Sequence, residues 1–98
     1  ARIAGIMGAK KTSDLIPLCH PIALNKVEIE LKIESDGIGI LATAKTTDRT
    51  GVEMEALTAV TITGLTLIDM IKAMDPHAAI RDVQVESKSG GKTGDWHR

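Results

Sequence analysis

Aromatic side chains are nearly absent from this chain of 98 residues, which has no Phe, no Tyr and a single Trp. The hydrophobic core is therefore expected to be aliphatic, built from Ile, Leu, Val, Met and Ala, and small for each residue. A chain of this length buries only about two-thirds of the surface that its unfolded form exposes. Association between subunits is one way to bury more apolar area, and we expect it here.

A strong charge of one sign is also missing, since the formal net charge is −1 and the lysines are scattered. Without a positive field or aromatic rings for base stacking, nucleic-acid binding is disfavoured. The single cysteine, Cys19, cannot form an intramolecular disulfide, and we recognise neither a signal peptide nor a membrane-spanning run of apolar residues. These absences favour a cytoplasmic protein without a membrane partner.

Two periodicities predict the first half of the structure. Apolar residues at helical spacing predict a helix over residues 1–11. Residues 26–34 alternate between apolar and charged side chains, as a half-buried strand does. Asp36-Gly37 is a hairpin signal, and the two-residue period resumes over residues 38–44. We therefore expect two antiparallel strands joined by a tight turn.

A long amphipathic helix is predicted over residues 52–74, where Asp75-Pro76 ends it. Ile80, Val83 and Val85 indicate a last strand, and a glycine-rich tail follows. The order of elements is thus helix, strand, strand, helix, strand, in a single domain over residues 1–98. One further strand before Ala1 would complete an α+β, ferredoxin-like (split βαβ) fold, with two helices on one face of an antiparallel sheet. We expect that first strand to be missing from this chain.

The long helix carries a possible proton-transferring pair. Asp69 and Lys72 are three residues apart, so their side chains meet on one helix face. An ordinary surface ion pair, which contributes almost nothing to stability, is the alternative. Glu55 lies on the same stripe but fourteen residues earlier, or roughly 21 Å along the axis. If both ends serve one ligand, the ligand is long or the site is shared between subunits.

A stiff apolar loop surrounds a Cys-His pair. Pro17 and Pro21 restrict the backbone on either side of Cys19 and His20, so the imidazole is held in a fixed direction. It would suit a phosphate or a carbonyl, although a structural histidine that bonds to the backbone is an equal alternative. One Cys and one adjacent His do not supply the three or four ligands of a zinc site. We therefore expect no metal site.

The tail has the composition of an anion-binding loop. Gly90 and Gly91 let backbone amides approach an anion, and Lys88 and Lys92 flank them with positive charge. The tail is not a nucleotide-binding P-loop, because Glu86 stands where that motif needs its first glycine. A flexible terminus is the alternative.

Three stretches together resemble the molybdenum cofactor biosynthesis protein C family: residues 14–21 (DLIPLCHP), 51–59 (GVEMEALTA) and 88–95 (KSGGKTGD). Residues 69–73 (DMIKA) fit the same family. The resemblance implies a cyclic pyranopterin monophosphate synthase, which turns a cyclised dihydro-GTP into a pterin and releases pyrophosphate. It implies a ferredoxin-like subunit in a hexamer of dimers with pockets between subunits, and an N-terminal part that this chain lacks.

The resemblance also assigns roles by matched position. Asp69 and Lys72 become the catalytic pair, and the remaining matched residues become substrate-binding: Lys10, Leu18, Cys19, His20, Met54, Glu55, Lys88 and Lys92. No cofactor is implied, and whether magnesium assists the phosphate stays open. The alternative function is a non-catalytic ferredoxin-like module that binds an anionic nucleotide or pterin metabolite. Such a module needs the lysines but has no evident use for the Asp69–Lys72 pair.

Overall fold

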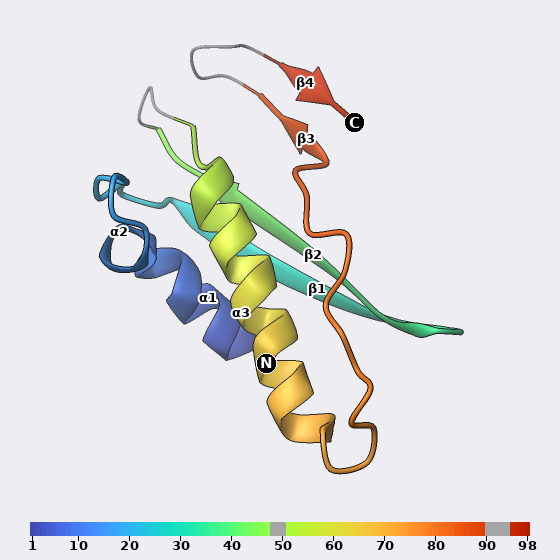
Figure 1. Ribbon diagram of the computed structural model, residues 1–98. Coiled ribbons are helices and arrows are strands. Elements are labelled where there is room, and N and C mark those ends of the chain that lie inside the picture. The colour runs from blue at the N-terminus through green and yellow to red at the C-terminus, as the bar shows by residue number, and fades with distance from the viewer. Residues whose placement is uncertain (48–50, 90–94) are drawn as a thin grey trace.

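A computed structural model describes residues 1–47, 51–89 and 95–98 of the chain. Two helices, labelled α1 and α3 in Figure 1, lie side by side against a β-hairpin. The C-terminal segment runs back along the side of α3 that faces away from α1. The elements are α1 (Arg2–Lys10), α2 (Thr12–Leu15), β1 (Lys26–Glu34), β2 (Gly37–Lys45), α3 (Glu53–Ile71), β3 (Ser87–Lys88) and β4 (Trp96–His97). The molecule is therefore a mixed α+β structure, as predicted; the short helix α2 was not predicted.

The hairpin follows the alternation in the sequence. β1 and β2 pair antiparallel in a continuous register from Lys26 opposite Lys45 to Glu34 opposite Gly37. On β1, Ile29 is buried toward the helices, whereas the neighbouring Glu28 and Glu30 are exposed. Because side chains of a strand alternate between its two faces, one face of the hairpin contacts the helices and the other meets solvent. The predicted strands and turn are confirmed.

Small residues bring α1 and α3 close together. Gly5, Gly8 and Ala9 of α1 are buried, and so are Ala59 and Thr63 of α3. A methyl group on Gly5 would overlap the Thr63 hydroxyl and come within 2.9 Å of the Ala59 carbonyl oxygen. The buried core is correspondingly small, and its members are Ala9, Ile29 and Ala59. Partly buried aliphatic side chains, among them Ile6, Leu24 and Ile40, pack around it.

The central helix α3 is long and apolar. It ends at Ile71, three residues before the predicted end, and turns follow. By length and composition alone this helix could cross a membrane; in the described structure it packs against α1 and β2. Its threonine hydroxyls donate to carbonyl oxygens four residues earlier: Thr58 to Met54, Thr61 to Leu57, Thr63 to Ala59 and Thr66 to Ile62. These hydroxyls therefore need no partner outside the helix.

The strand predicted through Ile80, Val83 and Val85 is wrong. Residues 78–86 have no regular secondary structure, and Ile80 instead packs against α3 beside Gly64. The described strands form two separate two-stranded sheets, β1–β2 and β3–β4. Within the described residues no strand pairs with the second side of β2. An apolar alternation forms a strand only where a neighbouring strand supplies hydrogen bonds, and among the described residues no strand pairs with residues 78–85.

Replacing Gly5 by Ala is expected to destabilise the fold by about 1–3 kcal/mol, because the added methyl overpacks the α1–α3 contact against backbone. Gly37→Ala is the matched control, since a methyl there meets nothing within 4 Å. The free energy of unfolding, from urea titration followed by circular dichroism, checks both. Equal stability of the two variants would contradict the proposed close contact.

Candidate functional site

The candidate residues fall into two groups at opposite ends of α3. Glu55 and Met54 lie in the first turn of the helix, together with the Cys-His loop, while Asp69 and Lys72 lie at its other end. Fourteen residues separate Glu55 from Asp69, or roughly 21 Å along a continuous helix. One copy of the chain therefore does not bring the two groups to the same atom. The separation expected from the sequence is what the structure shows.

At the first end, the Cys-His loop is fastened to the helix by a buried carboxylate. Glu55 is only 3% exposed, and the Cys19 thiol donates to its Oε2 over 3.7 Å. Partial burial, and then the negative charge of Glu55, raises the pKa of the Cys19 thiol. Cys19 is thus a neutral hydrogen-bond donor here, because both effects disfavour its thiolate.

The remaining candidates at this end are open to solvent. Lys10 and His20 are exposed, Leu18 is 99% exposed and Met54 is 39% exposed. Apolar side chains as exposed as Leu18 are available to a ligand or to another chain. At this end of α3, Glu55 is therefore a buried and fixed support. Leu18 and His20 form an exposed surface that can make contacts.

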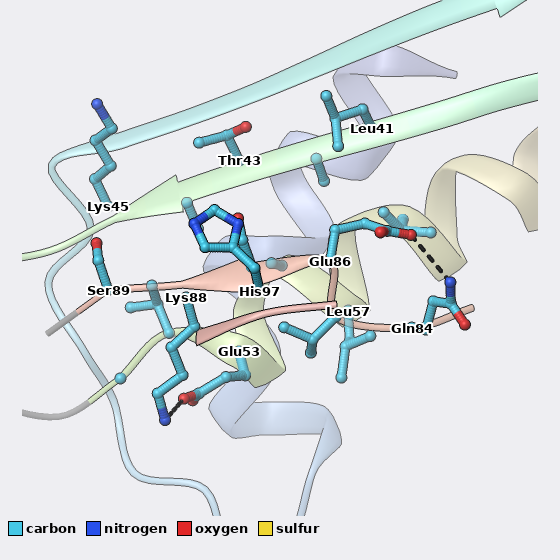
Figure 2. A pocket seen from close by; sticks show the side chains of 18 of the residues that line it. Leu41, Thr43, Lys45, Glu53, Leu57, Gln84, Glu86, Lys88, Ser89 and His97 are labelled. Carbon is cyan, nitrogen blue, oxygen red and sulfur yellow. Dashed lines mark hydrogen bonds and ion pairs between the residues drawn. The ribbon is translucent and has the colours of Figure 1, made fainter. Parts of the chain in front are cut away.

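Glu53 is a neighbour of this group that the sequence analysis missed. Its carboxylate forms an ion pair with the Lys88 ammonium, and the two side chains are only 27% and 23% exposed (Figure 2). The hydrogen bond from Lys88 lowers the pKa of Glu53. Glu53 is the first residue of α3, where the helix dipole also favours an acid, and this position was the available signal.

Lys88 is positioned by a short sheet that was not predicted. Residues Ser87–Lys88 pair with Trp96–His97, which the sequence analysis had set aside as tail. Arg98 adds to this tie, since its backbone N–H donates to the Glu86 carbonyl and its Nε to that of Val85. Lys92, Gly90 and Gly91 lie outside the described residues. Of the four residues predicted to form the anion-binding tail, only Lys88 therefore has a described position.

At the far end, Asp69 and Lys72 form the ion pair that their spacing predicts, with 2.8 Å between Nζ and Oδ1. Both side chains are largely exposed, at 73% and 65%. The hydrogen bond and the opposite charge lower the pKa of Asp69 and raise that of Lys72. The Lys72 ammonium is therefore stabilised in its charged form in the described structure, where the pair is exposed to solvent.

A groove of about 870 Å³ lies beside the first group, between β2, the start of α3 and the C-terminal segment (Figure 2). Its walls include Lys45, Glu53, Leu57 and Lys88. Of the nine candidate residues that the structure describes, Lys88 lines this groove and the others do not. In the described part of the chain, no three His, Cys, Asp or Glu side chains are grouped to hold a metal ion.

Glu53→Gln is expected to reduce the loss of stability in acid. Because Lys88 lowers the pKa of folded Glu53 below its ordinary 4.5, the pair stabilises the fold above that pH and stops doing so as pH falls through the lowered value. Between about pH 6 and about pH 3, the unmodified chain should lose about 1 kcal/mol more unfolding free energy than the variant. Urea titrations at both pH values check this, and identical losses would count against the pair.

The sequence matches known proteins over its whole length. It is 67% identical over 98 residues to the cyclic pyranopterin monophosphate synthase of Streptomyces griseus, covering 100% of this chain and 55% of that protein. It is 59% identical over 98 residues to cyclic pyranopterin monophosphate synthase 2 of Mycobacterium bovis, with 100% and 59% covered. The synthase of Nocardioides sp. is 56% identical over 101 residues, with 100% and 62% covered.

The chain therefore spans little more than half the length of these relatives. The family comparison covers residues 1–91, which include both ends of α3, the Cys-His loop and Lys88. Because this match extends over nearly all of the chain, the protein belongs to the MoaC family.

Proposed function

We propose that the longer protein to which this chain corresponds is a cyclic pyranopterin monophosphate synthase of molybdenum cofactor biosynthesis. Its reaction converts (8S)-3',8-cyclo-7,8-dihydroguanosine 5'-triphosphate to cyclic pyranopterin monophosphate and releases pyrophosphate. The observation that carries this proposal is the match to the MoaC family over residues 1–91, with relatives up to 67% identical that bear this enzyme's name. All of the proposed site residues except Lys92 lie within the matched region.

The active site is shared between subunits in this proposal. The Glu55 and Lys88 end of one subunit meets the Asp69–Lys72 end of another, because α3 keeps the two ends of one chain roughly 21 Å apart. Exposure of the Asp69–Lys72 pair in one chain supports this arrangement, since a partner and a substrate could then cover it. We propose the hexamer of dimers, located in the cytoplasm, that the family resemblance implies.

Each residue then has a physical role. Lys88, Lys92 and Lys10 hold the triphosphate and offset the charge that develops as pyrophosphate leaves. The substrate's ribose hydroxyl attacks the phosphorus nearest the ribose, and the bond from that phosphorus to pyrophosphate breaks. The hydroxyl proton passes to a base. Positioning supplies much of the acceleration, because both reacting groups belong to one bound molecule.

Asp69 and Lys72 move protons during the ring opening and reclosure that build the pyranopterin. In the uncovered chain Asp69 raises the pKa of Lys72, so the side chain stays protonated and cannot accept a proton. Covering the pair with a second subunit would remove water from the ammonium and favour its neutral form. Lys72 would then act as acid and base in turn, with Asp69 setting its direction through their hydrogen bond.

The finer fold is also part of the proposal. We infer a ferredoxin-like subunit whose first strand belongs to the N-terminal part of the longer protein. The observed order of α1, the β1–β2 hairpin and α3 supports it, as these are consecutive elements of the split βαβ arrangement.

Lys72→Ala in the longer protein is expected to slow pyrophosphate release by about 10²–10⁴-fold, because it removes a proton-transferring group. The assay supplies the cyclised dihydro-GTP and measures pyrophosphate. Lys32→Ala on the exposed face of the hairpin is the control and should turn over normally. Unchanged turnover of the Lys72 variant would refute its role, and tight substrate binding without turnover by the unmodified protein would favour the non-catalytic module.

Mixing two inactive variants should restore part of the activity if the site is shared. Lys88→Ala disables one half of each site and Lys72→Ala the other. After co-refolding in equal amounts, half of the dimers are mixed and each has one intact site, so about a quarter of the normal activity should return. Activity no higher than that of either variant alone would mean that one subunit supplies both groups.

A further inference from the structure

The pairing of β3 with β4 places a tryptophan ring beside Lys88. The two strands lie side by side and antiparallel (Figure 1), and Lys88 is directly opposite Trp96. Side chains of directly opposite residues project from the same face of a sheet, with Cβ atoms about 4.5–5.5 Å apart. Trp96 is 42% exposed, so the structure covers more than half of it. The ring therefore borders the aliphatic stem of Lys88 and limits the directions that this side chain can take.

Arg98 holds the Trp96 ring. The Cζ atom of its guanidinium lies 5.3 Å from the ring centroid, within the roughly 6 Å over which a cation and an aromatic face attract each other. The guanidinium is itself anchored to the segment that precedes β3, because its Nε donates to the Val85 carbonyl over 2.9 Å. The backbone N–H of Arg98 donates to the Glu86 carbonyl over 2.7 Å and so continues the β3–β4 ladder by one residue pair. Turning the ring away from Lys88 would therefore break its contact with an anchored guanidinium.

The position of Lys88 depends on this support. β3 consists of Ser87 and Lys88, and within the described residues β4 is the strand with which it pairs. A lysine side chain is flexible, and a free one spreads its ammonium over many positions. Here the Lys88 side chain is only 23% exposed and its ammonium is paired with Glu53. A side chain that is held along its stem and at its head keeps its charge in one place, which lowers the cost of ordering it around a phosphate group.

We propose that Trp96 and Arg98 are positioning residues for Lys88, and that they direct its ammonium toward the phosphate groups of the substrate. This inference rests on the proposed function, from which it takes the role of Lys88 in holding the triphosphate. Neither positioning residue needs to touch the substrate. Both lie beyond residue 91, where the family match ends, so the role proposed for them does not come from that match.

Binding of inorganic tripolyphosphate to the longer protein, measured by isothermal titration calorimetry, tests the proposal. Lys88→Ala should weaken binding at least about tenfold, because a charge-assisted hydrogen bond is lost. Trp96→Ala should weaken it about threefold to tenfold, because the ammonium is no longer preorganised. In the Lys88→Ala protein the further change Trp96→Ala should have no effect, because Trp96 acts only through Lys88. Equal losses from Trp96→Ala with and without Lys88, or no loss in either protein, would overturn the proposal.

Conservative variants distinguish positioning from a general loss of structure. Trp96→Phe keeps a ring beside the lysine stem and should retain tripolyphosphate affinity within about twofold. Arg98→Lys keeps the charge but not the planar group that stacks on the ring, so it should weaken binding about threefold. It is also the second variant if Trp96→Ala does not fold. Arg81→Lys is the matched control and should leave binding unchanged, because Arg81 belongs to the same C-terminal segment but forms its ion pair with Asp36. Equal losses from the two arginine variants would contradict the role of Arg98.

Pyrophosphate release from the cyclised dihydro-GTP separates this inference from the proposed function. Turnover by the unmodified protein, with independent losses from Trp96→Ala and Lys88→Ala in tripolyphosphate binding, removes the positioning role alone. Turnover without tripolyphosphate binding removes it as well, because the inference assigns polyphosphate binding to Lys88. Coupled losses without turnover remove the enzymatic function alone, and Trp96 and Arg98 then remain positioning residues of an anion-binding module.

Discussion

The close contact between α1 and α3 is the interaction on which the rest of the structure depends. With no Phe or Tyr to fill space, the chain gains contact by bringing backbones together at Gly5 and Gly8. Thr63 fits this contact because its hydroxyl is already bonded to Ala59 and brings no unsatisfied polar group. The contact fixes the direction of α3, and α3 in turn fixes where each candidate residue lies.

Local patterns predicted the elements whose partners are close in the sequence. β1 and β2 are joined by a two-residue turn, so the alternation over residues 26–44 contains nearly all the information that the hairpin needs. Ile80, Val83 and Val85 show a similar apolar pattern, but a strand there depends on a distant neighbour, which the described residues do not provide. The short pair β3–β4 was missed because two residues are too few for any periodicity.

Among the candidate site residues, contacts between close neighbours in the sequence were predictable, whereas contacts between distant residues were not. The spacing of Asp69 and Lys72 on a helix was enough to predict their ion pair, because both residues lie within one turn. That Glu55 would be buried beneath Cys19 depended on how a proline-rich loop folds back onto α3, which no local pattern specifies. Glu53 was missed for a similar reason, since its partner Lys88 is distant in sequence and reaches it only through the return of the C-terminal segment.

The apolar character of α3 has a consequence for the order of synthesis. Its mean hydropathy of 1.5 is as high as that of many membrane-spanning helices, so the isolated helix resembles one in length and composition. Yet α1, β1 and β2 all precede it in the chain and therefore leave the ribosome first. The surfaces of α1 and the hairpin that contact α3 are already made when it emerges, and only the C-terminal segment with Ile80 follows it. A circular permutation that placed α3 at the start would keep every contact of the folded state and still expose this helix without a partner during translation.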